Sequence, residues 1–162
     1  MDTINEIRSF RNEYFFLSNF YPCKIVHDGA QYDNLEAAFQ AAKCSDDTER
    51  LWFQCLEAVE AKKLGKRVKL RKDWERVKLL ILNELIGLKF INNPELMVKL
   101  IVTGNAYLSE DNNWHDNFYG NCTCPRCVDK PGYNYLGYAL MRLRNQSLYT
   151  VNYFNTGSLI NR

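Results

Sequence analysis

Three residues in one short stretch supply the side chains that acid–base and amine chemistry require. Glu36, Gln40 and Lys43 recur at helical spacing, and at 100° per residue they fall within a stripe of about 60°. If this stripe faces a cavity, a carboxylate, an amide and an ammonium share one small space. A carboxylate and an amine in such surroundings suit proton transfer or Schiff-base formation. Glu36 and Lys43 are therefore candidate catalytic residues, and Gln40 is a candidate substrate-binding residue.

The element that must position these side chains is a helix predicted over residues 32–43. The stretch is rich in Ala and contains neither Gly nor Pro. Asp33 is expected to cap it, with Glu36 at the third helical position. The other positions of the helix body are Ala, Phe or Leu, which predicts an almost fully enclosed helix. In the alternative interpretation, Glu36 only completes a capping box and Lys43 only complements the helix dipole.

Length and composition restrict the class of protein. The 162 residues, 46% of them hydrophobic and 14% aromatic, suffice for one domain with a core and argue against disorder. A net charge of +2 means that any basic patch must be local. No stretch is apolar for the length of a membrane span and no signal-peptide pattern opens the chain, so we expect a cytoplasmic protein without membrane contact. Six cysteines are then expected as thiols or metal ligands.

The remaining pattern predicts an α+β protein, mainly helical, in which short N-terminal strands precede a helical bundle. An all-α protein with one hairpin is the alternative. We expect a single domain over residues 1–162, with a patternless C-terminal tail over residues 147–162. Strands are expected at residues 14–17, 24–27 and 106–108, and further helices at residues 45–63, 74–90, 94–103 and 136–146.

Two further segments carry groups that could hold a nucleotide. Ser18, Asn19 and Phe20 offer a hydroxyl, an amide and an aromatic ring, which suit a sugar and a stacked base, although an ordinary turn explains them equally well. Residues 62–72 contain seven Lys or Arg and no acidic residue around a glycine. This segment, which includes Arg67 and Arg71, predicts a phosphate-binding patch, with a solvated surface as the alternative.

A polar loop studded with aromatic residues is predicted over residues 112–120. It carries Trp114, His115, Asp116 and Tyr119 on irregular backbone, where functional side chains often lie. Asp116 is a candidate catalytic residue there. The alternative is a loop that is held together by its aromatic side chains.

Three cysteines follow this loop directly. Cys122, Cys124 and Cys127 form a CxCxxC pattern with Pro in the inner pair, which is typical of a zinc knuckle. Tetrahedral zinc needs a fourth ligand, and His115, His27 or Cys23 could supply it. Reduced thiols without a metal are the alternative.

Several segments taken together resemble one family. The resemblance spans residues 10–144 and depends on the order of its motifs more than on any single motif. The motifs are Phe16-Leu-Ser-Asn-Phe-Tyr-Pro22, Glu36-Ala-Ala-Phe-Gln-Ala-Ala-Lys43, Leu64-Gly-Lys-Arg-Val68, Leu70-Arg-Lys-Asp-Trp-Glu75, Lys89-Phe90 with Asn93-Pro94, Thr103-Gly104, Trp114-His-Asp-Asn-Phe-Tyr-Gly120, Asn134-Tyr-Leu-Gly137 and Leu140-Met-Arg-Leu-Arg144. This set is similar to the NADAR family, also called YbiA-like.

The resemblance implies an N-glycosidase. Family substrates include phosphorylated ribosylamino-pyrimidine intermediates of riboflavin synthesis and ADP-ribose attached to guanine, also in nucleic acid. The family's acidic helix residue corresponds to Glu36, its lysine to Lys43 and its loop acid to Asp116. The His that commonly follows the helix Glu is here Ala37, which weakens any mechanism that needs it, and the usual loop Trp is Tyr119, which preserves stacking.

The implied chemistry suits these side chains. Cleavage of a ribose–nitrogen bond builds positive charge on the sugar, and Glu36 or Asp116 would stabilise that charge while water attacks. In a variant, Lys43 attacks the anomeric carbon and forms a transient imine. The chemistry requires no cofactor, and zinc would be structural.

Substrate binding is expected from a wider set of side chains. The predicted substrate-binding residues are Ser18, Asn19, Phe20, Gln40, Arg67, Arg71, Trp74, Trp114, Tyr119 and Asn134.

Two other classes of function are compatible with the sequence. The first is a non-catalytic module that binds ADP-ribose or a nucleotide in the same pocket. The second is a small zinc-stabilised nucleic-acid binder that uses the basic segment and the cysteines. The second ranks last because it leaves the enclosed polar stripe unexplained.

Overall fold

The computed structural model describes residues 5–157, with side chains described through residue 148. It confirms the α+β class, with short strands among longer helices. No helix in this described part has the length and apolar character that crossing a bilayer would need. In chain order the elements are β1 (Glu6–Arg8), the 3₁₀-helix η1 (Asn12–Leu17), β2 (Pro22–His27), β3 (Ala30–Asn34), α1 (Leu35–Ala41), α2 (Asp47–Leu51), α3 (Ala58–Leu64), α4 (Trp74–Asn92), α5 (Pro94–Val102), β4 (Tyr107–Ser109), β5 (Asp111–Asn112), β6 (Asn121–Cys122) and α6 (Tyr135–Gly157).

The chain divides into two compact units. The central unit is Phe15–Leu96, and the terminal unit combines the residues up to Tyr14 with those from Met97 onward. The expectation of a single domain with a separate tail stays a prediction.

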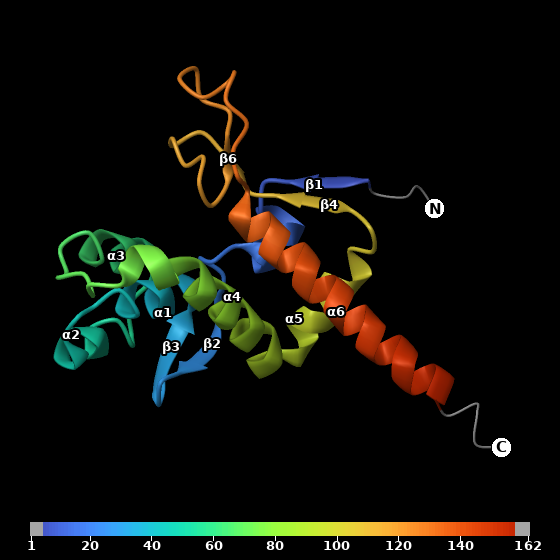
Figure 1. Ribbon diagram of the computed structural model, residues 1–162, viewed down its shortest axis with the longest axis horizontal. Helices are drawn as coiled ribbons and strands as arrows, with labels where there is room; N and C mark the ends of the chain where they lie inside the picture. Colours follow the sequence, from blue (N-terminus) through green and yellow to red (C-terminus); the bar gives the residue numbers. More distant parts are fainter. Residues whose placement is uncertain (1–4, 158–162) are drawn as a thin grey trace. The chain divides into compact units, whose positions relative to one another are not determined.

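The central unit is built on the β2–β3 hairpin and the helix that follows it (Figure 1). Asp28 and Gly29 both have positive φ, of 50° and 75°, as a two-residue turn between antiparallel strands requires. Helix α1 follows β3 without a loop and packs against β3, α3 and α4. All seven of its residues are buried, so the predicted enclosure of this helix is confirmed.

The start of α1 differs from the prediction. Residues 32–34 belong to β3, and the N-cap is Asn34 rather than Asp33. The Asn34 Oδ1 accepts a hydrogen bond from the Ala37 amide at 2.8 Å, and its Nδ2 donates to the Leu56 carbonyl at 2.9 Å. Asp33 is exposed because the alternation of β3 turns its side chain outward.

Two further elements were predicted wrongly. Residues 14–17 lie in η1 rather than a strand, with Phe16 and Leu17 buried. The helix predicted over residues 45–63 is split into α2 and α3. The break buries Phe53 completely and brings the Leu56 carbonyl to Asn34, so tertiary packing overrides the local helical pattern.

The ends of two long helices also differ from expectation. Helix α4 begins after Asp73 as predicted, but the Asp73 carboxylate makes no capping bond and binds Arg71 instead. Helix α6 continues to Gly157, past the predicted end at residue 146 and into the segment that was expected to lack a pattern.

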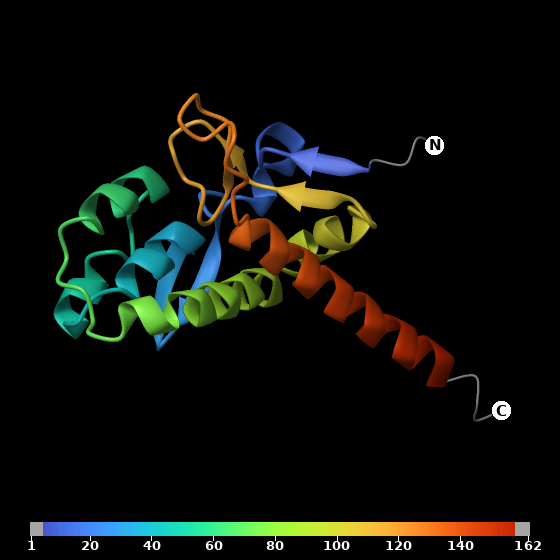
Figure 2. The same ribbon diagram turned by 45° about the horizontal axis from the view of Figure 1, so that its top comes forward.

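The terminal unit joins the two ends of the chain. Strand β1 pairs in parallel with β4, and α6 packs along β4 (Figures 1 and 2). Arg144 on α6 is buried and donates to the Thr103 hydroxyl at 2.7 Å and to the Ala106 carbonyl at 3.0 Å. The strand predicted at residues 106–108 is confirmed as β4, whereas the short parallel pair β5–β6 was not predicted.

Candidate functional site

Glu36 and Gln40 form a buried polar pair on α1. Both residues are only 5% exposed to solvent, and the Gln40 Nε2 donates a hydrogen bond to the Glu36 Oε1 at 2.7 Å. Because the amide binds the carboxylate through its N–H, the other amide atom, Oε1, points away and has no hydrogen-bond partner among the described residues. The pair therefore holds a carboxylate in a fixed orientation inside the protein.

Gly65, where α3 ends, closes over this pair. A Cβ atom at Gly65 would lie 1.8 Å from the Gln40 Oε1 and 2.6 Å from its Cδ. Only glycine permits such an approach, so the residue that follows the last turn of α3 also serves the packing of Gln40. Nothing in the sequence indicated this contact, because it joins residues from separate helices.

Lys43 lies in the turn just after α1, partly buried beside Trp74. Its Nζ is 6.0 Å from the Trp74 ring centroid, and Trp74 packs against Phe39 at 5.1 Å. Burial lowers the pKa of Lys43, and the nearby charges of Lys62 and Lys66 lower it further, while Glu36 opposes them. The predicted acid and amine are thus electrostatic neighbours.

The segment of Ser18, Asn19 and Phe20 is brought to the start of α1. The Glu36 amide donates to the Asn19 carbonyl at 3.0 Å, and the Ser18 Oγ accepts from the Phe20 amide at 3.2 Å. The Lys62 Nζ lies 5.3 Å from the Phe20 ring centroid. Of these residues, which were predicted to bind substrate, Asn19 is hydrogen-bonded to the backbone of Glu36.

Lys89 is hydrogen-bonded to the segment of Ser18, Asn19 and Phe20, and no role was predicted for it from the sequence. It is 1% exposed, and its Nζ donates to the Ser18 carbonyl at 2.7 Å. A lysine four residues after the buried Leu85, on the apolar side of a core helix, was the signal that could have identified it. A buried ammonium requires such partners, so we infer that Lys89 has a structural role and holds the Ser18 backbone in place.

The basic segment lies beside the end of α1. The Arg71 amide donates to the Lys43 carbonyl at 2.8 Å, and the Ser45 amide donates to the Lys69 carbonyl at 3.0 Å. The Arg71 guanidinium is held by both Asp73 carboxylate oxygens, at 2.7 and 3.1 Å, and this hydrogen bonding raises its pKa. Arg67 is exposed, so the two arginines predicted to bind phosphate differ in availability.

Asp116 lies in the terminal unit, where its carboxylate organises a turn. Its Oδ1 accepts from the Phe118 amide at 3.0 Å and from the Tyr119 amide at 2.9 Å. Asn112 brackets the same residue, donating to the Asp116 carbonyl at 2.7 Å and accepting from its amide at 3.2 Å. Both of these carboxylate bonds use Oδ1, which leaves Oδ2 outside the turn.

The other predicted binding residues of this unit fall into two groups. Trp114 is half exposed, and the Tyr119 ring packs edge-on against Phe118 at 4.8 Å. Asn134 is buried and accepts from the Glu110 amide at 3.1 Å while donating to the Leu108 carbonyl at 2.9 Å. The Asn134 amide is thus engaged by its own unit.

His115, Cys122, Cys124 and Cys127 form a cluster that could hold a metal ion. Their ligand atoms all lie within 4.8 Å of one another. The His115 Nδ1 is 3.0 Å from the Cys127 Sγ and 3.6 Å from the Cys124 Sγ. Of the three fourth ligands considered from sequence, the structure brings His115 to the cysteines, while His27 and Cys23 belong to the central unit.

The ionisation of these cysteines is uneven without a cation. The hydrogen bond with His115 lowers the pKa of Cys124 to about 6, whereas burial, with the neighbouring Cys122 and Cys124, raises the pKa of Cys127 to about 11. A bound cation would favour the thiolate of every ligand. The donor set therefore fits a metal that accepts sulfur and nitrogen.

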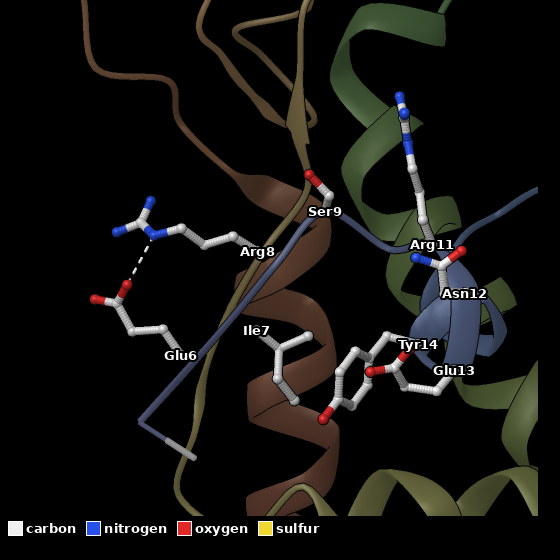
Figure 3. A pocket seen from close by; sticks show the side chains of 8 residues that line it. All are labelled: Glu6, Ile7, Arg8, Ser9, Arg11, Asn12, Glu13 and Tyr14. Atoms are coloured by element: carbon white, nitrogen blue, oxygen red, sulfur yellow. Dashed lines mark hydrogen bonds and ion pairs between the residues drawn. The ribbon is translucent and has the colours of Figure 1, made fainter.

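Two cavities lie elsewhere. One of about 320 Å³ is lined by residues 6–9 and 11–14 of the terminal unit, where Arg8 binds Glu6 and Tyr14 lies alongside Ile7 (Figure 3). Another of about 280 Å³ in the central unit includes His27 and Arg50. Neither lining contains a residue of the predicted site.

Comparison with known proteins identifies the family of this chain. A family model described as the NADAR domain matches residues 7–147. The chain belongs to the NADAR family. The resemblance seen in the ordered motifs of the sequence is therefore confirmed.

Individual NADAR proteins extend the comparison. The N-glycosidase YbiA of Escherichia coli (strain K12) is 34% identical over 152 residues, which cover 90% of this chain and 89% of that protein. An N-glycosidase of Nostoc punctiforme is 31% identical over 139 residues, 82% of this chain and 85% of that protein. The NMR structure of E. coli YbiA matches with a TM-score of 0.77 and 30% identity over 93% of this chain and 89% of that one. These names confirm the expected enzyme class, hydrolases of N-glycosyl bonds.

Proposed function

We propose that this NADAR protein is an N-glycosidase that hydrolyses a ribose–nitrogen bond in a phosphorylated nucleoside-like substrate. Guanine that carries ADP-ribose, free or on nucleic acid, and a ribosylamino-pyrimidine phosphate are the two substrate classes. The observation that carries the proposal is the buried Glu36–Gln40 pair with the Lys43 ammonium as its electrostatic neighbour. A solvated helix face would leave all three side chains in water.

In the main route, Glu36 stabilises the positive charge that develops on the ribose as the bond to nitrogen breaks. The Gln40 N–H fixes the carboxylate orientation, so little reorganisation is needed when the charge appears. Water attacks the anomeric carbon, and the base leaves as the nitrogen gains a proton. Asp116 remains a second candidate for a carboxylate in this role through its Oδ2.

In the variant route, the neutral Lys43 amine attacks the anomeric carbon and the base departs with a proton. The sugar ring opens to an imine, which water then hydrolyses to the phosphorylated ribose and the free amine of Lys43. The lowered pKa of Lys43 supports this variant, because it increases the fraction of neutral amine near neutral pH.

Substrate contacts follow from the cations and rings near Lys43. Lys62 and Lys66 contribute positive charge there, and Arg67 is exposed on the same basic segment, which suits a 5′-phosphate or diphosphate. Trp74 and Phe20 are rings of the central unit on which a base could stack, and Trp114 and Tyr119 are candidates in the terminal unit. We propose that the chemistry uses no cofactor, and that the metal held by the cysteine cluster is a structural Zn²⁺.

The decisive experiment measures freed base. The protein is incubated with ADP-ribosylated guanosine and, separately, with ribosylamino-pyrimidine phosphates, and free base is quantified. Glu36→Gln should abolish release, whereas Glu60→Gln, a control on the exposed side of α3, should leave it unchanged. Binding of ADP-ribose without release of base from either substrate would overturn the proposal in favour of the non-catalytic binding module.

A second experiment separates the two routes. Borohydride reduces an imine and traps a covalent protein–sugar adduct, which mass spectrometry detects. The Lys43 route predicts an adduct in the wild type that is absent from Lys43→Ala. Base release without any adduct would reject the imine and leave water attack.

A further inference from the structure

We propose that Zn²⁺ bound by His115, Cys122, Cys124 and Cys127 holds the segment of residues 112–119 in place and thereby positions Asp116. The four residues are called the zinc cluster below. The statement about the metal stands by itself, while the statement about catalysis rests on the role proposed for Asp116.

The donors of the zinc cluster fit zinc in kind and in spacing. Zinc lies about 2.3 Å from sulfur and about 2.0 Å from nitrogen, so neighbouring donors of a tetrahedral site are about 3.5–3.8 Å apart. The four ligand atoms of the cluster already lie within 4.8 Å of one another, and the His115 Nδ1 is 3.6 Å from the Cys124 Sγ and 3.0 Å from the Cys127 Sγ. Magnesium and calcium require oxygen donors, which this set lacks.

The backbone around the zinc cluster is arranged for a metal. The Cys122 amide donates to the Asn117 Oδ1 at 2.7 Å, and the Cys124 amide donates to the Cys122 Sγ at 3.4 Å. The Cys127 amide donates to the Cys124 carbonyl at 2.8 Å, which closes the turn of the inner pair. Hydrogen bonds to ligands and their neighbours orient metal-binding side chains, so the cluster has a supporting layer.

The ligand His115 connects the metal to Asp116, the next residue in the chain. The stretch from 113 to 119 forms neither helix nor strand, and His115 adopts a positive φ of 72°. Asn112 holds the stretch at one end through its two bonds to Asp116. At the other end, the carbonyls of residues 117–119 accept hydrogen bonds from the amides of Tyr133, Tyr135 and Leu136. The His115 ring adds a contact with Cys124 and Cys127 on the side that faces the zinc cluster.

Loss of the ion should therefore release one side of the Asp116 turn. The Phe118 and Tyr119 amides donate to the Asp116 carboxylate, so their protons should exchange faster once that carboxylate is no longer held in place. Four protein ligands close the coordination sphere, which is the arrangement of structural zinc sites. Any effect of the metal on turnover must then come from the position of the segment.

The test uses the full-length protein and needs no substrate in its first part. Zinc per chain is measured by mass spectrometry of the metal, Co²⁺ replacement by absorption, and exchange of the Phe118 and Tyr119 amides by NMR. We expect one zinc per chain, tetrahedral Co²⁺ spectra, and exchange of both amides at least about tenfold faster in Cys127→Ser. Cys55→Ser alters an exposed cysteine outside the zinc cluster and should match the wild type.

A rescue variant guards against simple misfolding. His115→Cys keeps a zinc ligand and should retain both the metal and slow exchange, whereas His115→Ala should lose both. The Ala37 amide, capped by Asn34 in the central unit, should exchange equally slowly in every variant. A wild type that binds neither zinc nor cobalt, or a zinc-free variant with unchanged exchange at Phe118 and Tyr119, would overturn the proposal.

The catalytic part is tested by turnover. Zinc removal should lower kcat in the wild type with little change in KM, and should have no further effect in Asp116→Asn. An Asp116→Asn variant that turns over like the wild type would overturn the catalytic part while the metal and exchange results stand. Failure of the proposed function would appear separately, as a wild-type protein that releases no base from either substrate.

Discussion

The two candidate carboxylates of this protein are held by opposite means. Glu36 lies on α1, a helix buried on all sides, and its conformation follows from packing against β3, α3 and α4. Asp116 lies on irregular backbone held by hydrogen bonds to Asn112 and its own turn, next to His115 of the proposed zinc cluster. The position of the first carboxylate depends on packing, and that of the second depends on a few polar contacts and on the ion that we propose.

Because the two carboxylates are held differently, their sites should respond differently to mutation. A site built on a packed helix should fail when a neighbour changes volume and should tolerate the loss of a surface polar group. A site built on a loop should respond in the opposite way.

The largest effect is expected from added volume beside Gln40. In Gly65→Ala the new methyl group overlaps the Gln40 amide and displaces the Glu36 carboxylate that it holds. A displacement of about 1 Å lowers activity about 10²-fold, so kcat should fall by that factor in the base-release assay. Gly87→Ala is the matched control, because nothing lies within 4 Å of a Cβ there, and it should keep full activity. Equal kcat in the two variants would contradict the packing account.

Removal of the Asn134 amide tests the polar scaffold of the terminal unit. Asn134→Ala leaves the Glu110 amide and the Leu108 carbonyl without their partner, which should lower the free energy of unfolding by about 2 kcal/mol. Urea denaturation measures it, with the exposed Asn113→Ala as control. A stability unchanged from the wild type, together with a raised KM, would show that Asn134 contacts substrate instead.

The capping of α1 is expected to matter less. Asn34→Ala removes the bond from the Ala37 amide and the bond to the Leu56 carbonyl, and should cost about 1–2 kcal/mol of stability. Asp33→Ala, one residue earlier and exposed, should change it by less than about 0.5 kcal/mol. A larger loss of stability in Asp33→Ala than in Asn34→Ala would mean that Asp33 caps α1, as the sequence predicted.

The smallest effect concerns the charge of Lys43. Because its pKa is lowered in the folded protein, the unfolded chain holds this proton to higher pH, and stability rises with pH between the lowered pKa and 10.5. Lys43→Met should therefore be more stable than the wild type at neutral pH, by less than about 1 kcal/mol for a partly exposed group, and the gain should shrink as the pH approaches 10.5. Denaturation at neutral pH and near pH 10 measures it.

Lys63→Met provides the control for that experiment, since Lys63 is an exposed lysine on the neighbouring α3. It should show neither the gain nor its dependence on pH. A Lys43→Met protein that is less stable than the wild type at neutral pH would mean that attraction to Glu36 outweighs burial.

The sequence predicted the regular parts of the site well because periodicity reports burial directly. The enclosed helix with Glu36 and Gln40 followed from a run of apolar residues broken at helical spacing. The cap was placed one residue early because Asp33 and Asn34 both suit that position, and only the alternation of β3 decides between them.

The irregular parts resisted prediction for a physical reason. The CxCxxC spacing indicated a metal, yet its fourth ligand depends on a left-handed backbone at His115 that no local pattern encodes. The contact of Gly65 with Gln40 likewise joins residues from separate helices. Such roles depend on tertiary contacts, which local secondary-structure propensity does not predict.

The parallel pairing of β1 with β4 has a consequence for synthesis on the ribosome. Ile7 pairs with Leu108, so the first strand must wait until about a hundred further residues have been translated. The stretch Phe15–Leu96 is contiguous and can condense earlier, while β1 stays an unsatisfied strand edge. Because its contacts join the two ends of the chain, the terminal unit is expected to fold later than the contiguous central unit.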